Sequence, residues 1–331
     1  MTERTPAREG ATSPLAGYYN LPMLKRPLWG WEIAIYFFSE GISSGAFILG
    51  TVADICGSGR YATLISRARF LALATLLPCP PLLIADLGRP ERFHHMLRTF
   101  KVTSPMSVGA WSLMAFSAPV TILALGRFSP FRPIPTKAVG AAGLPFALFM
   151  LAYPGVLLST TSIPVWSQSR WLGALLGASS MAGAASALAI TTALDPNSDA
   201  AAREAIQKIE GVTNFAEAIA LAGYVCTAGP AARPLTKGRH AKLFLLGAFA
   251  AGIALPALIT AARKKPGRVS TIVSGALSLA GAFALKWSIV HAGRDSAEDA
   301  AINRHVTRAG SQSPGWIPST GSRTGVMTAD K

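Results

Sequence analysis

Residues 67–125 read RARFLALATLLPCPPLLIADLGRPERFHHMLRTFKVTSPMSVGAWSLMAFSAPVTILAL, two apolar runs joined by a charged connector. Each run has about 20 mostly apolar residues, the length that an α-helix needs to cross a bilayer. A plain link between two membrane helices does not need the charge that the connector, residues 86–106, carries. Its ionisable side chains are Asp86, Arg89, Glu91, Arg92, His94, His95, Arg98 and Lys101. We therefore expect the connector to form a functional surface at the membrane edge.

Apolar runs of this kind recur along the whole chain and predict an all-α fold. The class is a polytopic integral membrane helix bundle of about eight transmembrane helices, which places both termini on one side. The sixth run is short, and the polar stretch before it, residues 200–211, is either an interfacial helix or an extension of that span. The predicted spans are 31–53, 67–86, 107–125, 137–158, 171–192, 213–230, 241–261 and 269–291.

Three regions divide the chain by composition. We predict a polar N-terminal segment over residues 1–30, a membrane domain over 31–292, and a polar, mobile C-terminal tail over 293–331. Of the 331 residues, 50% are apolar and only 14% are charged, whereas soluble proteins average about 25% charged residues. The deficit of charge is what contact with membrane lipid predicts.

The net charge of +15 does not indicate nucleic-acid binding. The basic residues lie in short clusters between the apolar runs, where Lys and Arg contact lipid headgroups. No nucleic-acid recognition motif accompanies them. We therefore expect no nucleic-acid partner.

Cysteine and histidine placement argues against a metal cofactor in this chain. The three cysteines are far apart and form no CxxC pair, so we expect no iron–sulfur cluster and no zinc site. A membrane di-haem cytochrome needs four histidines in paired helices, but of the five histidines only His291 falls within a predicted span. We therefore expect no haem.

Ionisable side chains inside the spans require an explanation, because placing a charge in hydrocarbon costs free energy. In the first span, Glu32, Tyr36 and Glu40 share one sector of the helix about 80° wide, which should face the bundle interior. The sixth and eighth spans contribute Glu217 and Lys286, and we expect Lys286 to pair with Glu217 or Glu40. Two interpretations remain open: a buried ion pair that fixes helix register, or a proton path or polar ligand site.

Glycine and proline make local predictions within the first two spans. Gly41 and Gly45 form a small-xxx-small pair that allows close helix approach. In the second span Pro78, Pro80 and Pro81 lack amide donors and must distort the helix. The distortion lies just before Asp86 and helps to set the direction in which its carboxylate points.

The connector itself predicts a short amphipathic helix at the membrane interface. Pro90 suits the first turn of a helix, and residues 91–100 place apolar side chains at i, i+3, i+4 and i+7. These side chains are Phe93, Met96, Leu97 and Phe100. Ser104 and Ser107 then cap the start of the third span. Residue types alone leave the connector as either a lipid anchor or a docking surface.

Three segments carry a resemblance to a known family. Ala85–Trp111, ADLGRPERFHHMLRTFKVTSPMSVGAW, closely resembles the segment that joins the second and third helices in the NrfD-like family, the membrane subunit of polysulfide-reductase-type complexes. Tyr19–Gly45, YNLPMLKRPLWGWEIAIYFFSEGISSG, and Ala152–Trp166, AYPGVLLSTTSIPVW, are similar to the same family. Together they cover about a quarter of the chain in the right order.

The resemblance implies an eight-helix subunit that binds a quinone, menaquinone or ubiquinone. Its electrons would pass to or from a ferredoxin-like iron–sulfur subunit, which in such complexes is often joined to a molybdopterin catalytic subunit. The location it implies is a bacterial-type cytoplasmic (inner) membrane. The chain would be a subunit of a respiratory-type oxidoreductase and catalytically incomplete alone.

The resemblance also implies roles for particular residues. Tyr153 matches the family's quinone-site tyrosine through its Tyr-x-Gly-Val-Leu-Leu-Ser context, and Asp86 and Glu32 would join it as quinone-binding groups. Asp86, Glu32, His94 and His95 would exchange protons. Glu40 departs from the family, whose residue there is expected to be small or apolar, and suggests a proton-conducting role. The surface expected to dock the partner consists of Arg89, Arg92, Arg98 and Lys101.

Two alternatives from other classes remain. The chain could be an ion-coupled transporter or proton-translocating unit that uses Glu40, Glu217 and Lys286. Such a unit favours an internal inverted repeat, but the disrupted second span has no counterpart four spans later. It could also be a purely structural membrane anchor that binds no quinone.

Overall fold

The structure is a computed structural model and describes residues 24–57, 61–126, 134–195, 200–262, 267–299 and 302. Within these residues all regular structure is helical, and eight helical segments are long and apolar enough to cross a membrane. The predicted all-α bundle with about eight spans is therefore confirmed. Residues 1–23 of the predicted N-terminal segment lie outside the described residues, as does the predicted tail from 300 onward except Ile302.

The helices follow the predicted spans in order and add short elements between them. They are α1 (Trp31–Cys56), α2 (Ala62–Leu76), α3 (Cys79–Asp86), η1 (Pro90–Arg92), α4 (Phe93–Arg98), α5 (Pro105–Leu125), α6 (Thr136–Ser159), α7 (Pro164–Ser167), α8 (Leu172–Leu194), α9 (Ala200–Ala228), η3 (Gly229–Ala232), α10 (Arg233–Thr236), η4 (Leu243–Ala254), α11 (Leu255–Ala261) and α12 (Arg268–Glu298).

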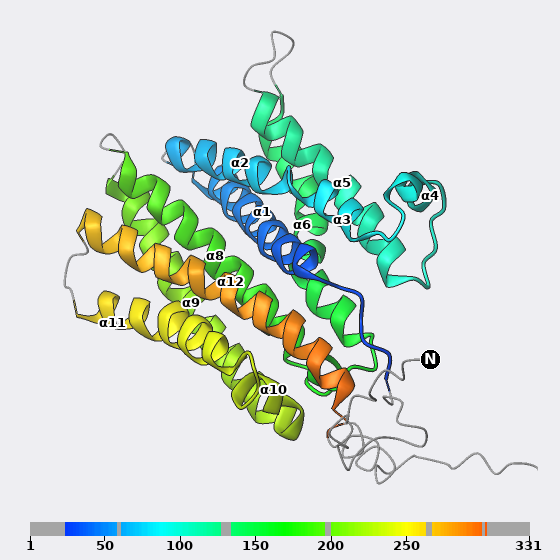
Figure 1. Ribbon diagram of the computed structural model, residues 1–331. Coiled ribbons are helices and arrows are strands. Elements are labelled where there is room, and N and C mark those ends of the chain that lie inside the picture. The colour runs from blue at the N-terminus through cyan, green and yellow to red at the C-terminus, as the bar shows by residue number, and fades with distance from the viewer. Residues whose placement is uncertain are drawn as a thin grey trace, which may run out of the picture.

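The most buried helices, α1 and α8, lie at the centre of the bundle. The first helix packs against α2, α6, α8 and α12, and α12 also packs against α8 and η4. Figure 1 shows α9 and α11 on one side of this centre, α5 and α3 on the other, and α4 standing off at one end. We call the end that carries Trp31, Asp86 and Glu298 the Asp86 face, and the end that carries Cys56, Leu194 and Arg268 the opposite face.

The second span is broken where the prolines predicted a distortion. The helix α2 ends at Leu76, and α3 restarts at Cys79 with Pro80 in its first turn. Proline has no amide hydrogen, so it is tolerated in a first turn but interrupts the interior of a helix. The break separates the direction of α3 from that of α2, and Asp86, the last residue of α3, lies at the end of the bundle where α1 begins.

The sixth and eighth spans are longer than the apolar runs alone suggested. The polar stretch before the sixth span is part of one continuous helix, α9, so it extends that span and does not form a separate interfacial helix. The last helix, α12, continues past residue 292 to Glu298. The seventh span begins with the π-helical segment η4, which hydropathy does not predict.

The connector differs from the single helix predicted over residues 91–100. It forms the short helices η1 and α4, and the chain is already extended at Thr99. Ser107 explains this early end, because its hydroxyl donates to the Thr99 carbonyl at 3.3 Å and accepts from the Lys101 amide at 3.0 Å. Phe100 therefore lies outside the helix and packs against Trp111. The predicted cap at Ser104 is confirmed, since its hydroxyl accepts from the Ser107 amide.

Small residues set the distance between α1 and α8. A Cβ atom at Gly41 would overlap the Ser180 side chain. One at Gly45 would lie 2.7 Å from Ala184 Cβ and 3.2 Å from the Ser180 carbonyl oxygen. The small-xxx-small prediction for this helix is therefore confirmed, and the close approach requires glycine at both positions.

We predict that Gly45→Ala lowers the thermal stability of the purified protein. The added methyl must displace the backbone of α8, and overpacking of this kind costs about 1–3 kcal/mol. Gly211→Ala is the matched control, since it lies within α9 and its Cβ would meet open space. Alanine favours a helix over glycine by about 1 kcal/mol, so the control should be neutral or stabilising. Equal melting temperatures for both variants in detergent would contradict the packing account.

Candidate functional site

Asp86 closes the second span and binds the start of the first. Its carboxylate lies near the backbone amide of Gly30, the residue before α1. A carboxylate is favourable there because the N-terminus of a helix carries unpaired amides and a partial positive charge. The contact ties the end of α3 to the beginning of α1.

Two charged neighbours surround this carboxylate, Glu32 and Arg294. Glu32 is half-buried and folds back over Gly30, since a Cβ atom there would overlap its carboxylate. Arg294 comes from α12, and its Nε is buried without a hydrogen-bond partner among the described residues. The site therefore joins three spans and keeps one unused donor.

Tyr153 lies near the same face, on α6. It is 5% exposed, and its hydroxyl donates to the Pro105 carbonyl at 3.3 Å. The ring and hydroxyl cover Gly109 of α5, where any Cβ atom would overlap them. Its electrostatic neighbours include Tyr36 and Glu40. The long hydrogen bond to a carbonyl leaves a donor that a ligand oxygen could take over.

An apolar cavity of about 140 Å³ lies between α3 and α5, and we call it the α3–α5 groove. Leu87, next to Asp86, lines it, and Phe93 brings the connector to its rim. The remaining lining residues are Pro80, Leu83, Ile84, Ala110, Leu113, Met114 and Ser117. The groove offers an apolar surface beside a polar edge, the usual composition of a small-molecule site.

The two connector histidines are exposed and do not join Asp86. His94 and His95 lie on α4 with their ring centroids 4.2 Å apart. In the described part of the chain neither ring forms a hydrogen bond or ion pair with Asp86. The structure therefore does not bring the two histidines into contact with Asp86.

The predicted docking residues all lie on the surface of the connector. Arg89, Arg92, Arg98 and Lys101 are exposed, and α4 stands away from the bundle (Figure 1). No ion pair within the described residues engages any of the four. Their charges therefore face outward.

Glu40 lies deeper than the other candidates. It is fully buried on α1, where it lies near Tyr36 and Lys286 and not near the Asp86 carboxylate. Tyr36 is also buried, so two of the three residues of the predicted inward sector face the interior and Glu32 lies at its edge. The predicted site thus divides into an edge group around Asp86 and an interior group around Glu40.

A further polar cluster on the Asp86 face escaped the sequence analysis. The Arg26 guanidinium lies 3.2 Å from the Glu298 carboxylate, and the His240 imidazole lies 3.4 Å from Asp295. His291 stacks on Trp287 with 4.4 Å between ring centroids. Arg294 and Asp295 fall within the predicted tail, but both lie on α12, because no proline follows His291 closely enough to end the helix.

Metal ligation receives no support from the described residues. No three His, Cys, Asp or Glu side chains among them converge on a possible metal position. The three cysteines are separate, with Cys79 buried and Cys56 and Cys226 exposed.

An eight-span helical bundle with a charged edge site defines a multi-pass membrane protein. The family profile described as "Polysulphide reductase, NrfD" matches residues 20–295. The chain belongs to this NrfD family. The match covers the whole predicted membrane domain and most of the chain, so it extends well beyond the three segments that resemble the family.

Two relatives agree with this assignment. One chain of the polysulfide reductase of Wolinella succinogenes is 28% identical over 301 residues, which cover 81% of this protein and 94% of the relative. One subunit of the selenate reductase of Mesobacillus selenatarsenatis is 30% identical over 88 residues, or 27% of this protein and 20% of the relative. The protein is therefore a membrane subunit of an oxidoreductase.

We predict that Asp86→Ala loosens the start of α1. Loss of a carboxylate beside a helix N-terminus costs about 0.3–2 kcal/mol, so the Gly30 amide should exchange with deuterium severalfold faster. Hydrogen exchange with peptide mass spectrometry measures this directly. Glu91→Ala, an exposed carboxylate of the connector, is the control and should leave exchange unchanged. Unchanged exchange in both variants would refute the proposed capping contact.

Proposed function

We propose that this chain is the quinone-interacting membrane subunit of a respiratory oxidoreductase in a bacterial-type cytoplasmic membrane. It would exchange electrons between a membrane quinone, menaquinone or ubiquinone, and an iron–sulfur partner docked on the Asp86 face. The observation that carries the proposal is the α3–α5 groove, an apolar cavity beside Asp86 and below an exposed basic connector.

The residues around the groove fit a quinone. Apolar side chains suit its ring and tail, and a quinone oxygen needs a hydrogen-bond donor. The buried Nε of Arg294 has no partner in the described residues, and the Tyr153 hydroxyl makes only a long bond to a carbonyl. Both groups lie on the Asp86 face, and both are hydrogen-bond donors of the type that a quinone oxygen needs.

When bound, a quinone supplies two-electron, two-proton redox chemistry. Asp86 and Glu32 would hold or release protons at the membrane edge, since a half-buried carboxylate beside a second one can exchange its proton with water. His94 and His95 are exposed on α4 and would relay protons to the aqueous phase. Tyr153 would orient one quinone oxygen through its hydroxyl.

The basic connector supports docking of an electron-carrying partner. Quinone turnover needs a redox centre within reach, and iron–sulfur clusters need sets of cysteine ligands that these three separate cysteines do not supply. Arg89, Arg92, Arg98 and Lys101 would steer an acidic partner surface to this face. A ferredoxin-like subunit that carries electrons to or from a molybdopterin subunit fits these requirements.

Tyr153→Phe should lower quinol oxidation by the isolated complex about tenfold or more, since one positioned donor is lost. Tyr224→Phe is a matched control, because Tyr224 is also buried and donates to a carbonyl, that of Val165, at 2.8 Å. Steady-state assays with a short-chain quinol would measure both. Equal activities, with the partner still bound, would favour a purely structural anchor.

Charge reversal at the connector should weaken assembly. Arg92→Glu should slow association with the partner about tenfold at low salt, and the difference should shrink as salt rises. Lys137→Glu, an exposed reversal at the start of α6 on the opposite face, should change neither. Binding kinetics of the purified subunits would show this, and equal effects of both reversals would remove the connector from the interface.

A further inference from the structure

We propose that a row of buried polar side chains conducts protons between the Asp86 face and the opposite face. The row runs through the contact between α1, α8, α9 and α12. It begins at Tyr153 and Glu40, passes Lys286 and Glu217, and ends at two cavities, the larger of which is bordered by Arg268. The proposal rests on the proposed function for the source of its protons.

The first part of the row is Glu40. Its side chain is 0% exposed, and neither carboxylate oxygen has a hydrogen-bond partner in the described residues. The nearby Ser44 hydroxyl instead donates to the Gly41 carbonyl at 3.2 Å. An unpartnered buried carboxyl group is a poor structural element. Its electrostatic neighbours include Tyr36 and Tyr153, and Tyr153 belongs to the candidate quinone site.

Lys286 and Ser179 form the middle of the row. Lys286 is 1% exposed, and its ammonium donates to the Ser179 hydroxyl at 3.3 Å. Glu217 has both Ser179 and Lys286 as electrostatic neighbours. The Ser179 hydroxyl therefore lies among the groups of the predicted Lys286–Glu217 pairing. Lys286 also lies against α1 at Gly41, with Glu40 as an electrostatic neighbour.

The helix α9 continues the row toward the opposite face. Glu217, Asn214 and Glu210 follow one another at helical spacing, so each lies about one turn, or about 5.4 Å, from the next. All three are buried. Ser278 of α12 donates to the Asn214 side-chain oxygen at 3.4 Å, and Ser186 of α8 donates to Glu210 at 2.9 Å. Three helices therefore contribute polar groups along this segment.

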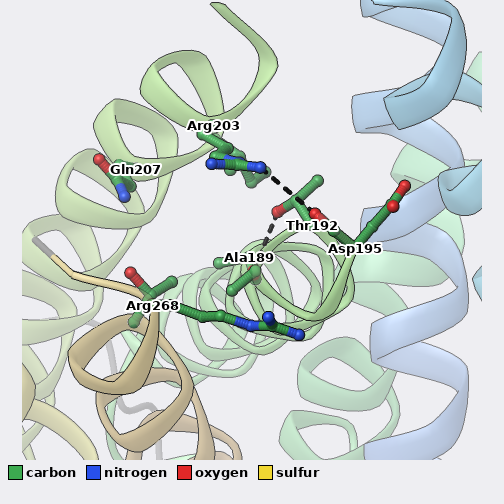
Figure 2. Close-up of a pocket in the computed structure, with 9 residues that line it drawn as sticks. Ala189, Thr192, Asp195, Arg203, Gln207 and Arg268 are labelled. Carbon is green, nitrogen blue, oxygen red and sulfur yellow. Dashed lines mark hydrogen bonds between the residues drawn. The ribbon is translucent and has the colours of Figure 1, made fainter. Parts of the chain in front are cut away.

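Two cavities complete the row. A small one, about 30 Å³, borders Glu210, Gln207 and Thr271, and a polar cavity of this size has room for an ordered water molecule. Gln207 and Thr271 also border a cavity of about 250 Å³ at the opposite face. Figure 2 shows the guanidinium groups of Arg203 and Arg268 on opposite sides of that larger cavity.

Proton transfer along such a row is balanced and needs no redox partner. At each step an O–H or N–H bond breaks on one group as an O–H or N–H bond forms on the next. A hydroxyl such as Ser179 or Ser278 accepts one proton and releases another, whereas the amide of Asn214 orients the Ser278 hydroxyl and does not itself transfer a proton. A simple ion pair that fixes helix register would place Lys286 directly against a carboxylate and would not need Glu210 or Asn214 in line with it.

Proton release on the two sides of the membrane tests the proposal. The complex is reconstituted in liposomes, a short-chain quinol is added, and external ferricyanide, which cannot cross the bilayer, takes electrons from the outward-facing partner. Oxidation of one quinol gives two protons, and its two electrons reduce two ferricyanide ions. A trapped pH dye then reports protons that reach the lumen, on the opposite face.

The wild-type complex should acidify the lumen as ferricyanide is reduced. In Glu217→Gln the lumen signal per electron should fall about tenfold or more, because an amide cannot release a proton. Glu204→Gln is the matched control on the same helix, with its side chain 69% exposed, and should keep the wild-type signal. An unchanged signal in Glu217→Gln, or wild-type turnover that acidifies only the outside, would overturn the relay.

Failure of the proposed function has a different signature. If the wild-type complex retains its partner but reduces no ferricyanide with quinol, the quinone assignment fails. Liposomes that contain the full chain alone then decide the relay, with proton uptake driven by a potassium gradient and valinomycin. Faster uptake in wild type than in Glu217→Gln supports the relay, and equal rates overturn it.

Discussion

The close contact of α1 with α8 is the constraint on which the rest of the structure depends. Glycine at positions 41 and 45 lets the two helices approach until any added Cβ atom would meet Ser180 or Ala184. This proximity brings Lys286 of α12 against α1 and near Glu40. In a bilayer, where lipid tails are as apolar as leucine, packing of small residues and interhelical hydrogen bonds must hold the helices together. The buried polar row is therefore built into the packing of the bundle.

A second contact connects this interior to the membrane edge. The proline break between α2 and α3 directs Asp86 toward Gly30, so the end of the second span lies beside the beginning of the first. The same break leaves the α3–α5 groove open beside the connector. The edge site thus follows from local backbone chemistry, because three prolines without amide hydrogens break the second span, and the carboxylate at the end of that span complements the amides at a helix start.

The sequence predicted those features that depend on local chemistry. The eight spans, the break at Pro78, the Ser104 cap and the glycine pair follow from hydropathy, missing donors and side-chain size. Features that depend on the relative register of helices were not predictable. Arg294 beside Asp86 and Ser179 between Lys286 and Glu217 are examples, since neither pairing leaves a spacing pattern in one chain. The connector helix ended early because Ser107, in the next helix, binds its end.

The central claim is that a quinone and an electron-carrying partner meet at the Asp86 face. A cryo-electron microscopy structure of the complex, purified with its partner and reconstituted in lipid nanodiscs with added menaquinone, tests it most directly. We predict density for the quinone ring between α3 and α5, near Asp86 and Tyr153, and a cluster-bearing subunit on Arg92 and Arg98. A partner bound to the opposite face, or quinone density far from α3, would contradict the account.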